Sequence, residues 1–246
     1  MMARQTRNVP DDSTQSQMRI SIVLLALTVT SAAVDAVTFL ALGHAFATLV
    51  TGNVLLLGFA VVRGGPVLGP ALAVTAFVVG VAAAHAVIVR VSTRGRRWFI
   101  AALAAETAVI CSAGIYAAAV SGSQGLPAHA KPVVIVLLAC AMGWRNRAMV
   151  DVDIPEMPTT VAQTTLVKTI SDLLPFHSGT ARASALTRAR RAATILGMFT
   201  GAAAGTLLLR LGPGPTLLVV AGIEAAVTAI YARTPRLRPP AVAEPP

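Results

Sequence analysis

The chain has 246 residues, of which 55% are hydrophobic and 12% are charged, and its formal net charge is +10. Soluble domains carry roughly 25% charged residues, so this composition predicts an integral membrane protein. Its arginines stand in short clusters between apolar segments, with no interleaved aromatic residues and no basic helix face. This pattern excludes a nucleic-acid partner and indicates clusters that orient the chain in a bilayer.

Both ends of the chain differ from its centre. We expect residues 1–18 to be a disordered cytoplasmic tail and residues 236–246 a proline-rich disordered tail, because neither can form a packed core. Residues 19–235 then make a single transmembrane domain. A cleaved signal peptide is excluded, since the first apolar segment continues to Leu42 and more apolar segments follow.

The first apolar segment, about 20–42, carries polar residues at helical spacing. Thr28, Ser31, Asp35 and Thr38 share one face of the expected helix. A carboxylate near the middle of a span costs about 2.5–3.5 kcal/mol on insertion scales. Asp35 is therefore a candidate binding or proton-carrying group, with Ser31 and Thr38 beside it, and a helix–helix hydrogen bond is the structural alternative.

Two further segments are apolar but interrupted. The segment at 46–62 contains Thr51, Gly52 and Asn53, which predict a helix break. Such a break exposes backbone groups to a ligand in some transporters, but it is equally typical of a helical hairpin tip. The second segment, 157–175, is mixed in character. Each segment either crosses as a short span or enters the membrane and returns, and the re-entrant arrangement of both removes a conflict with the positive-inside rule.

Small and acidic residues mark the other spans, which we place at about 67–91, 98–120, 133–144, 192–211 and 216–232. Small residues recur four apart in two of them, which predicts close helix packing. These residues are Gly80 and Ala84 in one span and Gly197, Gly201 and Gly205 in the other. Glu106 and Glu224 also lie within spans, either as a structural pair or as a proton relay.

The arginine clusters predict the topology. With six crossing helices, the two termini and the loops at 92–97 and 177–191 are cytoplasmic, and the turns at 121–130 and 212–215 lie outside. Each half of the domain, about 19–120 and 133–232, then reads as span, interrupted segment, span, span. The halves enter from opposite sides, which predicts a three-plus-three inverted repeat in an all-α polytopic bundle. In this repeat Asp35 corresponds to Asn146, and Glu106 to Glu224.

The chain resembles the YoaK family of bacterial multi-pass membrane proteins, also called domain of unknown function 1275. The resemblance rests on Val34-Asp35-Ala36, Phe39, Leu42-Gly43, Thr51-Gly52-Asn53, Met142-Gly143, Asn146 and Thr159-Thr160-Val161. It covers about residues 18–235 and implies about six helices and no established activity. The sequence departs from the family pattern at Ala32 (usually Gly), at Arg145 and Arg147 (usually Gln and a small residue), and at Gln163-Thr164 (usually Thr-Gly).

Transport is the leading functional hypothesis. A small inner-membrane secondary transporter would place an unknown small molecule or ion near Asp35, Thr51, Gly52, Asn53 and Asn146, with proton coupling through Asp35 left open. A membrane scaffold or partner protein, in which the buried polar groups only specify packing, is the alternative, and the sequence leaves oligomerisation open. Because enzyme, cofactor and metal-binding motifs are lacking, we expect no enzyme activity, no cofactor and no metal.

Overall fold

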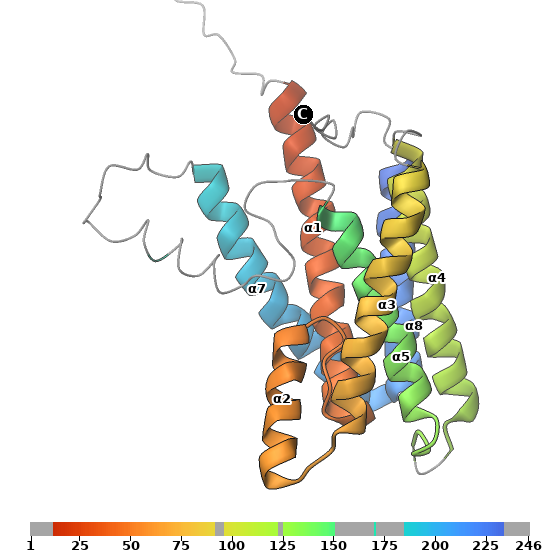
Figure 1. The fold of residues 1–246 in the computed structure, drawn as a ribbon. Helices are drawn as coiled ribbons and strands as arrows, with labels where there is room; N and C mark the ends of the chain where they lie inside the picture. Colours follow the sequence, from red (N-terminus) through yellow and green to blue (C-terminus); the bar gives the residue numbers. More distant parts are fainter. Residues whose placement is uncertain (1–11, 92–95, 123–124, 151–169, 171–184, 234–246) are drawn as a thin grey trace, which may run out of the picture.

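The computed structural model describes residues 12–91, 96–122, 125–150, 170 and 185–233 (Figure 1). Within these residues the chain is built from helices. The helices are α1 (Asp12–Val37), the π-helix η1 (Thr38–Gly43), α2 (Val50–Arg63), α3 (Leu68–Val91), α4 (Arg96–Val120), α5 (Lys131–Val150), α7 (Ala185–Leu208), the 3₁₀-helix η3 (Leu209–Leu211) and α8 (Pro213–Arg233). Residues 12–18, expected to be part of a disordered tail, belong to α1. The other residues of the predicted tails and all of the second interrupted segment except residue 170 lie outside the described residues.

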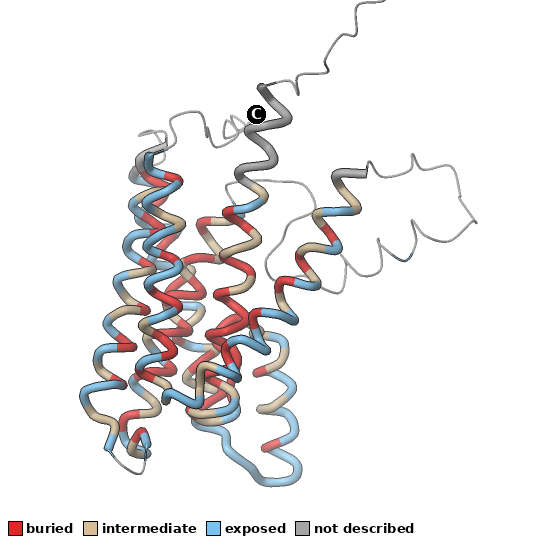
Figure 2. The backbone as a smooth tube through the Cα atoms, turned by 180° about the vertical axis from the view of Figure 1, so that it is seen from behind, coloured by how far each residue is buried: buried red, intermediate tan, exposed pale blue. Residues whose placement is uncertain are grey.

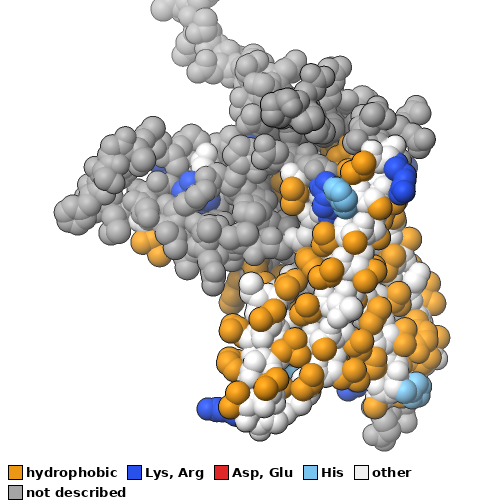
Figure 3. Space-filling view, viewed as in Figure 1, with side chains coloured by type: hydrophobic (Ala, Val, Ile, Leu, Met, Phe, Trp, Pro, Cys, Tyr) orange, Lys and Arg blue, Asp and Glu red, His pale blue; other side chains and the backbone are white. Residues whose placement is uncertain are grey.

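Six of these helical segments are long and apolar enough to cross a membrane. They are Ser21–Gly43, Leu68–Arg90, Trp98–Val120, Lys131–Val150, Thr187–Leu211 and Pro213–Arg233. Their outward faces carry many exposed large hydrophobic side chains (Figure 3). The chain is therefore a multi-pass helical membrane protein, as its composition predicts.

Helix α2 does not join this set. It has 14 residues, about 21 Å at 1.5 Å per residue, which is short of the roughly 30 Å hydrocarbon core. Figure 1 shows that it begins partway along the bundle and returns to the end where η1 stops and α3 begins. Helix α2 is therefore too short to cross the hydrocarbon core by itself.

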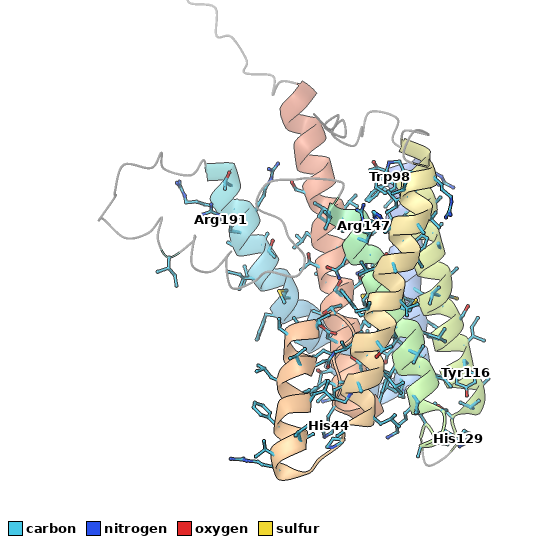
Figure 4. All side chains as sticks on the ribbon, in the orientation of Figure 1. His44, Trp98, Tyr116, His129, Arg147 and Arg191 are labelled. Atoms are coloured by element: carbon cyan, nitrogen blue, oxygen red, sulfur yellow. The ribbon has the colours of Figure 1, made fainter. Side chains whose placement is uncertain are left out.

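Basic residues lie at both ends of the bundle, with Arg63 and Arg210 at the end where α2 and η3 finish and a larger set at the other end. The start of α1 and the end of α8 lie at the same end, the upper one in Figure 1. Trp98 and Arg147 also lie there, whereas His44 and His129 lie at the opposite end (Figure 4). Helices α3 and α8 finish at this upper end with Arg90 and Arg233 in their last turns. We call it the arginine-rich end.

Three helix pairs make the most extensive contacts: α3 with α5, α1 with α7, and α4 with α8. Buried residues face these contacts and exposed residues face outward (Figure 2). Gly201 of α7 lies so close to α1 that an added Cβ would collide with the carbonyl of Val29. Gly197 and Gly205 approach the same helix one turn before and one turn after Gly201, so the glycines form a continuous contact line between α1 and α7.

A second close contact joins α3 to α5. A Cβ added to Gly80 would meet the carbonyl oxygen of Cys140, and one added to Gly143 would meet that of Phe77. Ala84, one turn beyond Gly80, is fully buried. These small residues let two helix backbones approach closely without a hydrophobic driving force between them, as membrane helices require.

Candidate functional site

The first span ends in the π-helix η1 at Gly43, close to the predicted end at residue 42, whereas the break predicted at Thr51-Gly52-Asn53 is absent because these residues are helical. In η1 the helix widens, and His44 closes it with a left-handed backbone (φ 56°) and a hydrogen bond from its N–H to the carbonyl of Phe39 at 3.2 Å. The chain then turns back through residues 44–49, which we call the return loop, before α2 begins. The predicted position of the break was therefore wrong, because Thr51, Gly52 and Asn53 form the first turn of α2.

Asn53 fixes the return loop. Its side-chain carbonyl accepts the N–H of Phe46 at 2.8 Å, and its side-chain amide donates to the carbonyl of Phe46 at 2.7 Å. These two bonds satisfy backbone groups that an apolar environment would penalise. Thr51 is exposed on the helix surface, and Gly52 lies beside the ring of Phe46. These three residues therefore hold or flank the loop and do not line the cavity described next.

Asp35 joins α1 to the return loop. Its carboxylate accepts the N–H of Thr48 at 2.8 Å and the hydroxyl of the same residue. Thr38, one turn further along, is fully buried and donates to the carbonyls of Val34 and Asp35. Neutral donors thus bind the carboxylate of Asp35. The hydroxyl of Thr38 bonds to backbone carbonyls of its own helix.

A cavity of about 270 Å³ lies between α1, the return loop and α7. Asp35 is the one acidic residue in its lining, and Ser31, Thr28, Thr48 and Thr206 add hydroxyl groups. The remaining lining residues are apolar: Ala32, Ala36, Phe39, Leu40, Phe46, Leu49, Met198 and Ala202. The rings of Phe39 and Phe46 stack with their centroids 4.6 Å apart. The site therefore offers one carboxylate and a hydroxyl stripe in an apolar, aromatic pocket.

Glu106 and Glu224 meet at a second polar cluster, which is built around Arg145. The Arg145 Nε atom pairs with Glu106, and its Nη2 atom pairs with Glu224. All three residues are at most 2% exposed. We call this cluster the buried triad; it brings together α4, α5 and α8.

Arg145 also reaches α1. Its Nη1 atom donates to the carbonyl of Leu27 at 2.9 Å, to the hydroxyl of Thr30 at 3.2 Å and to that of Ser31 at 2.7 Å. Ser31 is therefore shared, because its hydroxyl accepts from the triad and its side chain lines the cavity. The buried triad and the cavity meet at this residue.

The role of Arg145 was missed in the sequence. We expected Arg145 to end a span at residue 144 as an orienting charge, but α5 continues to Val150 and Arg145 is its most deeply buried charge. The two glutamates inside spans could have indicated a buried arginine, because two intramembrane carboxylates need a cation nearby. Asn146 lies beside it, half buried, with its amide bonded to the carbonyl of Met142 at 2.9 Å, and it does not line the cavity.

In the part of the chain that the structure describes, other reactive groups do not gather into a site. Cys111 and Cys140 are free thiols. Among the described residues, no group of three or more His, Cys, Asp or Glu side chains is placed to hold a metal ion. The two polar sites are thus the cavity at Asp35 and the buried triad.

The fold and these sites define a multi-pass helical membrane protein with two intramembrane polar sites. The chain matches the family model described as protein of unknown function (DUF1275) over residues 23–230. It therefore belongs to the DUF1275 family, as the motifs around Asp35 and Asn146 indicate. No curated protein and no solved structure matches the chain.

Proposed function

We propose that this protein is a small secondary transporter of the plasma membrane and that the cavity at Asp35 is its substrate site. The single observation that carries the proposal is the cavity itself. It places a carboxylate and hydroxyl groups inside a span, beside the π-helix that ends this span and a loop that turns back. Substrate sites of secondary transporters are commonly built at such interruptions near the middle of the membrane.

The helix pairing supports an inverted repeat. If the halves correspond as α1 to α5, α3 to α7 and α4 to α8, then the pair α3–α5 corresponds to the pair α7–α1, and α4–α8 corresponds to itself. These are the three pairs with the most extensive contacts. In Figure 1, α1 descends from the arginine-rich end whereas α5 ascends towards it. This arrangement fits a two-fold axis in the membrane plane, on which alternating access in many transporters depends.

The charge distribution supports the orientation. Cytoplasmic loops carry an excess of Lys and Arg, so we place the arginine-rich end and both termini in the cytoplasm. The turn before α5 and the turn between η3 and α8 lie at the opposite end (Figure 1). Asp35 lies nearer to Gly43 than to Ser21 in its span, so the cavity sits in the outer half of the bundle.

The lining chemistry favours a small solute with a positive or hydrogen-bond-donating group and an apolar body. Asp35 offers the negative charge, and the stacked pair Phe39 and Phe46 offers aromatic surface. Aromatic rings and a carboxylate together favour ammonium groups. We assign the cavity to transport and not to catalysis, because its lining has one carboxylate and no second acid or base.

Proteoliposomes test this proposal. Purified protein is reconstituted with a pH-sensitive dye inside the vesicles, and a panel of small primary and quaternary amines is added outside. At least one amine should change the internal pH or enter as labelled solute, and Asp35→Asn should abolish the effect while Arg63→Gln, at the far end of α2, retains it. Equal fluxes with empty vesicles for every amine would contradict the proposal.

A scaffold function is the second candidate, and one observation favours it. Asn53 bonds to the backbone of Phe46, and the charged groups of the buried triad pair with one another inside the protein. A scaffold predicts no binding at Asp35. Thermal unfolding in detergent separates the two, because a transporter should be stabilised by an amine in an Asp35-dependent way.

A further inference from the structure

The buried triad has an unbalanced charge. Glu106 and Glu224 each contribute a carboxylate, whereas Arg145 contributes one guanidinium. With both carboxylates ionised, the cluster would carry one net negative charge among residues that are at most 2% exposed. An uncompensated charge in such surroundings is costly, and two carboxylates that share one site do not both stay ionised easily.

In the buried triad, one carboxylate oxygen has no donor from the part of the chain that the structure describes to stabilise a negative charge. Among the described residues, the Oε2 atom of Glu224 is buried and has no hydrogen-bond partner. The Oε1 atom of Glu224 and the Oε1 atom of Glu106 both face the same guanidinium. The triad thus holds an unpartnered acceptor beside two carboxylates that compete for a single cation.

We propose that Glu106, Arg145 and Glu224 form a proton-binding site that carries one proton between its two carboxyl groups. With that proton the triad is neutral, and without it the triad carries one negative charge. A metal cation fits less well, because hard cations take six or more oxygen ligands, whereas the triad offers two carboxylates that are already paired with a guanidinium.

The neighbouring helices bring few other charges to this place. On α1 the titratable group of the described span is Asp35, which binds Thr48. On α3, His85 contacts Arg147 and not Arg145. On α8, the ring of Tyr231 packs edge-on against Phe99 of α4. The proton is therefore shared within the triad and not with these groups.

Arg145 can transmit the state of this site to the cavity. Its Nη1 atom holds Ser31 at 2.7 Å, and Ser31 lines the cavity with Asp35. When a carboxyl group takes the proton, its attraction for the guanidinium falls. The bonds of Arg145 to Leu27, Thr30 and Ser31 on α1 then become stronger relative to its pairs with the glutamates. The triad lies nearer to the arginine-rich end than Asp35 does, so the two sites face different halves of the bundle. This link rests on the proposed transport function, whereas the proton site does not.

Infrared spectroscopy of the reconstituted protein tests the proton site without any substrate. The measurement seeks the C=O stretching band of a protonated carboxylic acid, which shifts in D₂O, at neutral pH in the Asp35→Asn protein. That band should be present. Either Glu106→Gln or Glu224→Gln, added to Asp35→Asn, should abolish it, because the remaining glutamate is then neutralised by Arg145. Arg145→Gln should increase the band, since no cation then stabilises either carboxylate.

Each other result overturns the proposal. No band in Asp35→Asn would mean that the triad keeps a permanent negative charge. A band that persists in both glutamine variants would belong to another group. A band lost in only one of them would assign the proton to one residue and exclude sharing. If the double variants do not fold, absence of the band from the Asp35→Asn protein still overturns the proposal. Amine transport in proteoliposomes is measured separately, so failure of one proposal does not imply failure of the other.

Discussion

The cavity at Asp35 and the buried triad both place carboxylates inside a span, yet they stabilise them in opposite ways. Asp35 is held by the backbone and hydroxyl of one threonine and borders a cavity of about 270 Å³. Glu106 and Glu224 are held by a cation and enclosed by protein. Neutral donors can bind a carboxylic acid in either protonation state, whereas a buried cation needs at least one ionised partner. The difference indicates a binding site at Asp35 and, in the buried triad, a contact between helices whose charges are balanced.

Removing the cation should have the largest effect. Arg145→Gln leaves Glu106 and Glu224 together without a partner and also removes the donor to Leu27, Thr30 and Ser31. Breaking a buried pair on one side costs about 3–5 kcal/mol, so thermal unfolding in detergent should occur at a markedly lower temperature. Arg147→Gln is the matched control, because Arg147 lies at the bundle surface beside His85 and should cost under about 1 kcal/mol. Equal losses in both variants would remove the distinction between the two arginines.

Separating α1 from α7 should have the next largest effect. Gly201→Leu places a side chain where even a Cβ would meet the carbonyl of Val29. Overpacking of this kind costs about 1–3 kcal/mol, and it should also distort the cavity, whose walls include both helices. Gly58→Leu is the control, since nothing lies within 4 Å of an added Cβ there. Wild-type thermal stability in Gly201→Leu would show that the glycines do not form a helix interface.

The smallest effect should come from Asp35→Asn. The asparagine side-chain oxygen can still accept the N–H of Thr48, so the return loop should keep its position, with a change below about 1 kcal/mol. Asp35→Ala leaves the Thr48 donors unpaired and should cost about 1–3 kcal/mol more. Thermal unfolding of the two variants side by side checks this order. If Asp35→Asn were as unstable as Arg145→Gln, Asp35 would be a structural charge of the same kind as the buried triad.

The sequence predicted the six spans and the position of Asp35, Glu106 and Glu224 inside them, because a charge stands out in an apolar segment. It did not predict the role of Arg145, because Arg145-Asn146-Arg147 looks like an orienting cluster at the end of a span. Two residues apart on a helix lie on nearly opposite faces. Arg145 therefore faces the core, and Arg147 contacts His85 near the surface. Which of the two is buried follows from helix packing and not from the sequence pattern.

The position of the return loop could not be predicted from the sequence pattern either. Thr51-Gly52-Asn53 has the composition of a turn, whereas the residues that actually leave the helix, His44 to Leu49, are mostly apolar. Their backbone is satisfied by long-range side-chain contacts, from Asn53 to Phe46 and from Asp35 to Thr48. Only the three-dimensional structure shows these pairings, and the inferred role of Asn53 changes with them.

The comparison predicts that water reaches the cavity but not the buried triad, and cysteine accessibility tests this most directly. In a background with Cys111→Ala and Cys140→Ala, Ala36→Cys places a thiol in the cavity lining, and Ala221→Cys places one near Glu224 in the core of α8. Both alanines are buried, at 8% and 4% exposure, so the substitutions are matched. In proteoliposomes, a charged thiol reagent should modify Ala36→Cys and leave Ala221→Cys unmodified. If Ala36→Cys were as unreactive as Ala221→Cys, the site at Asp35 would be closed, and the transport account would be contradicted.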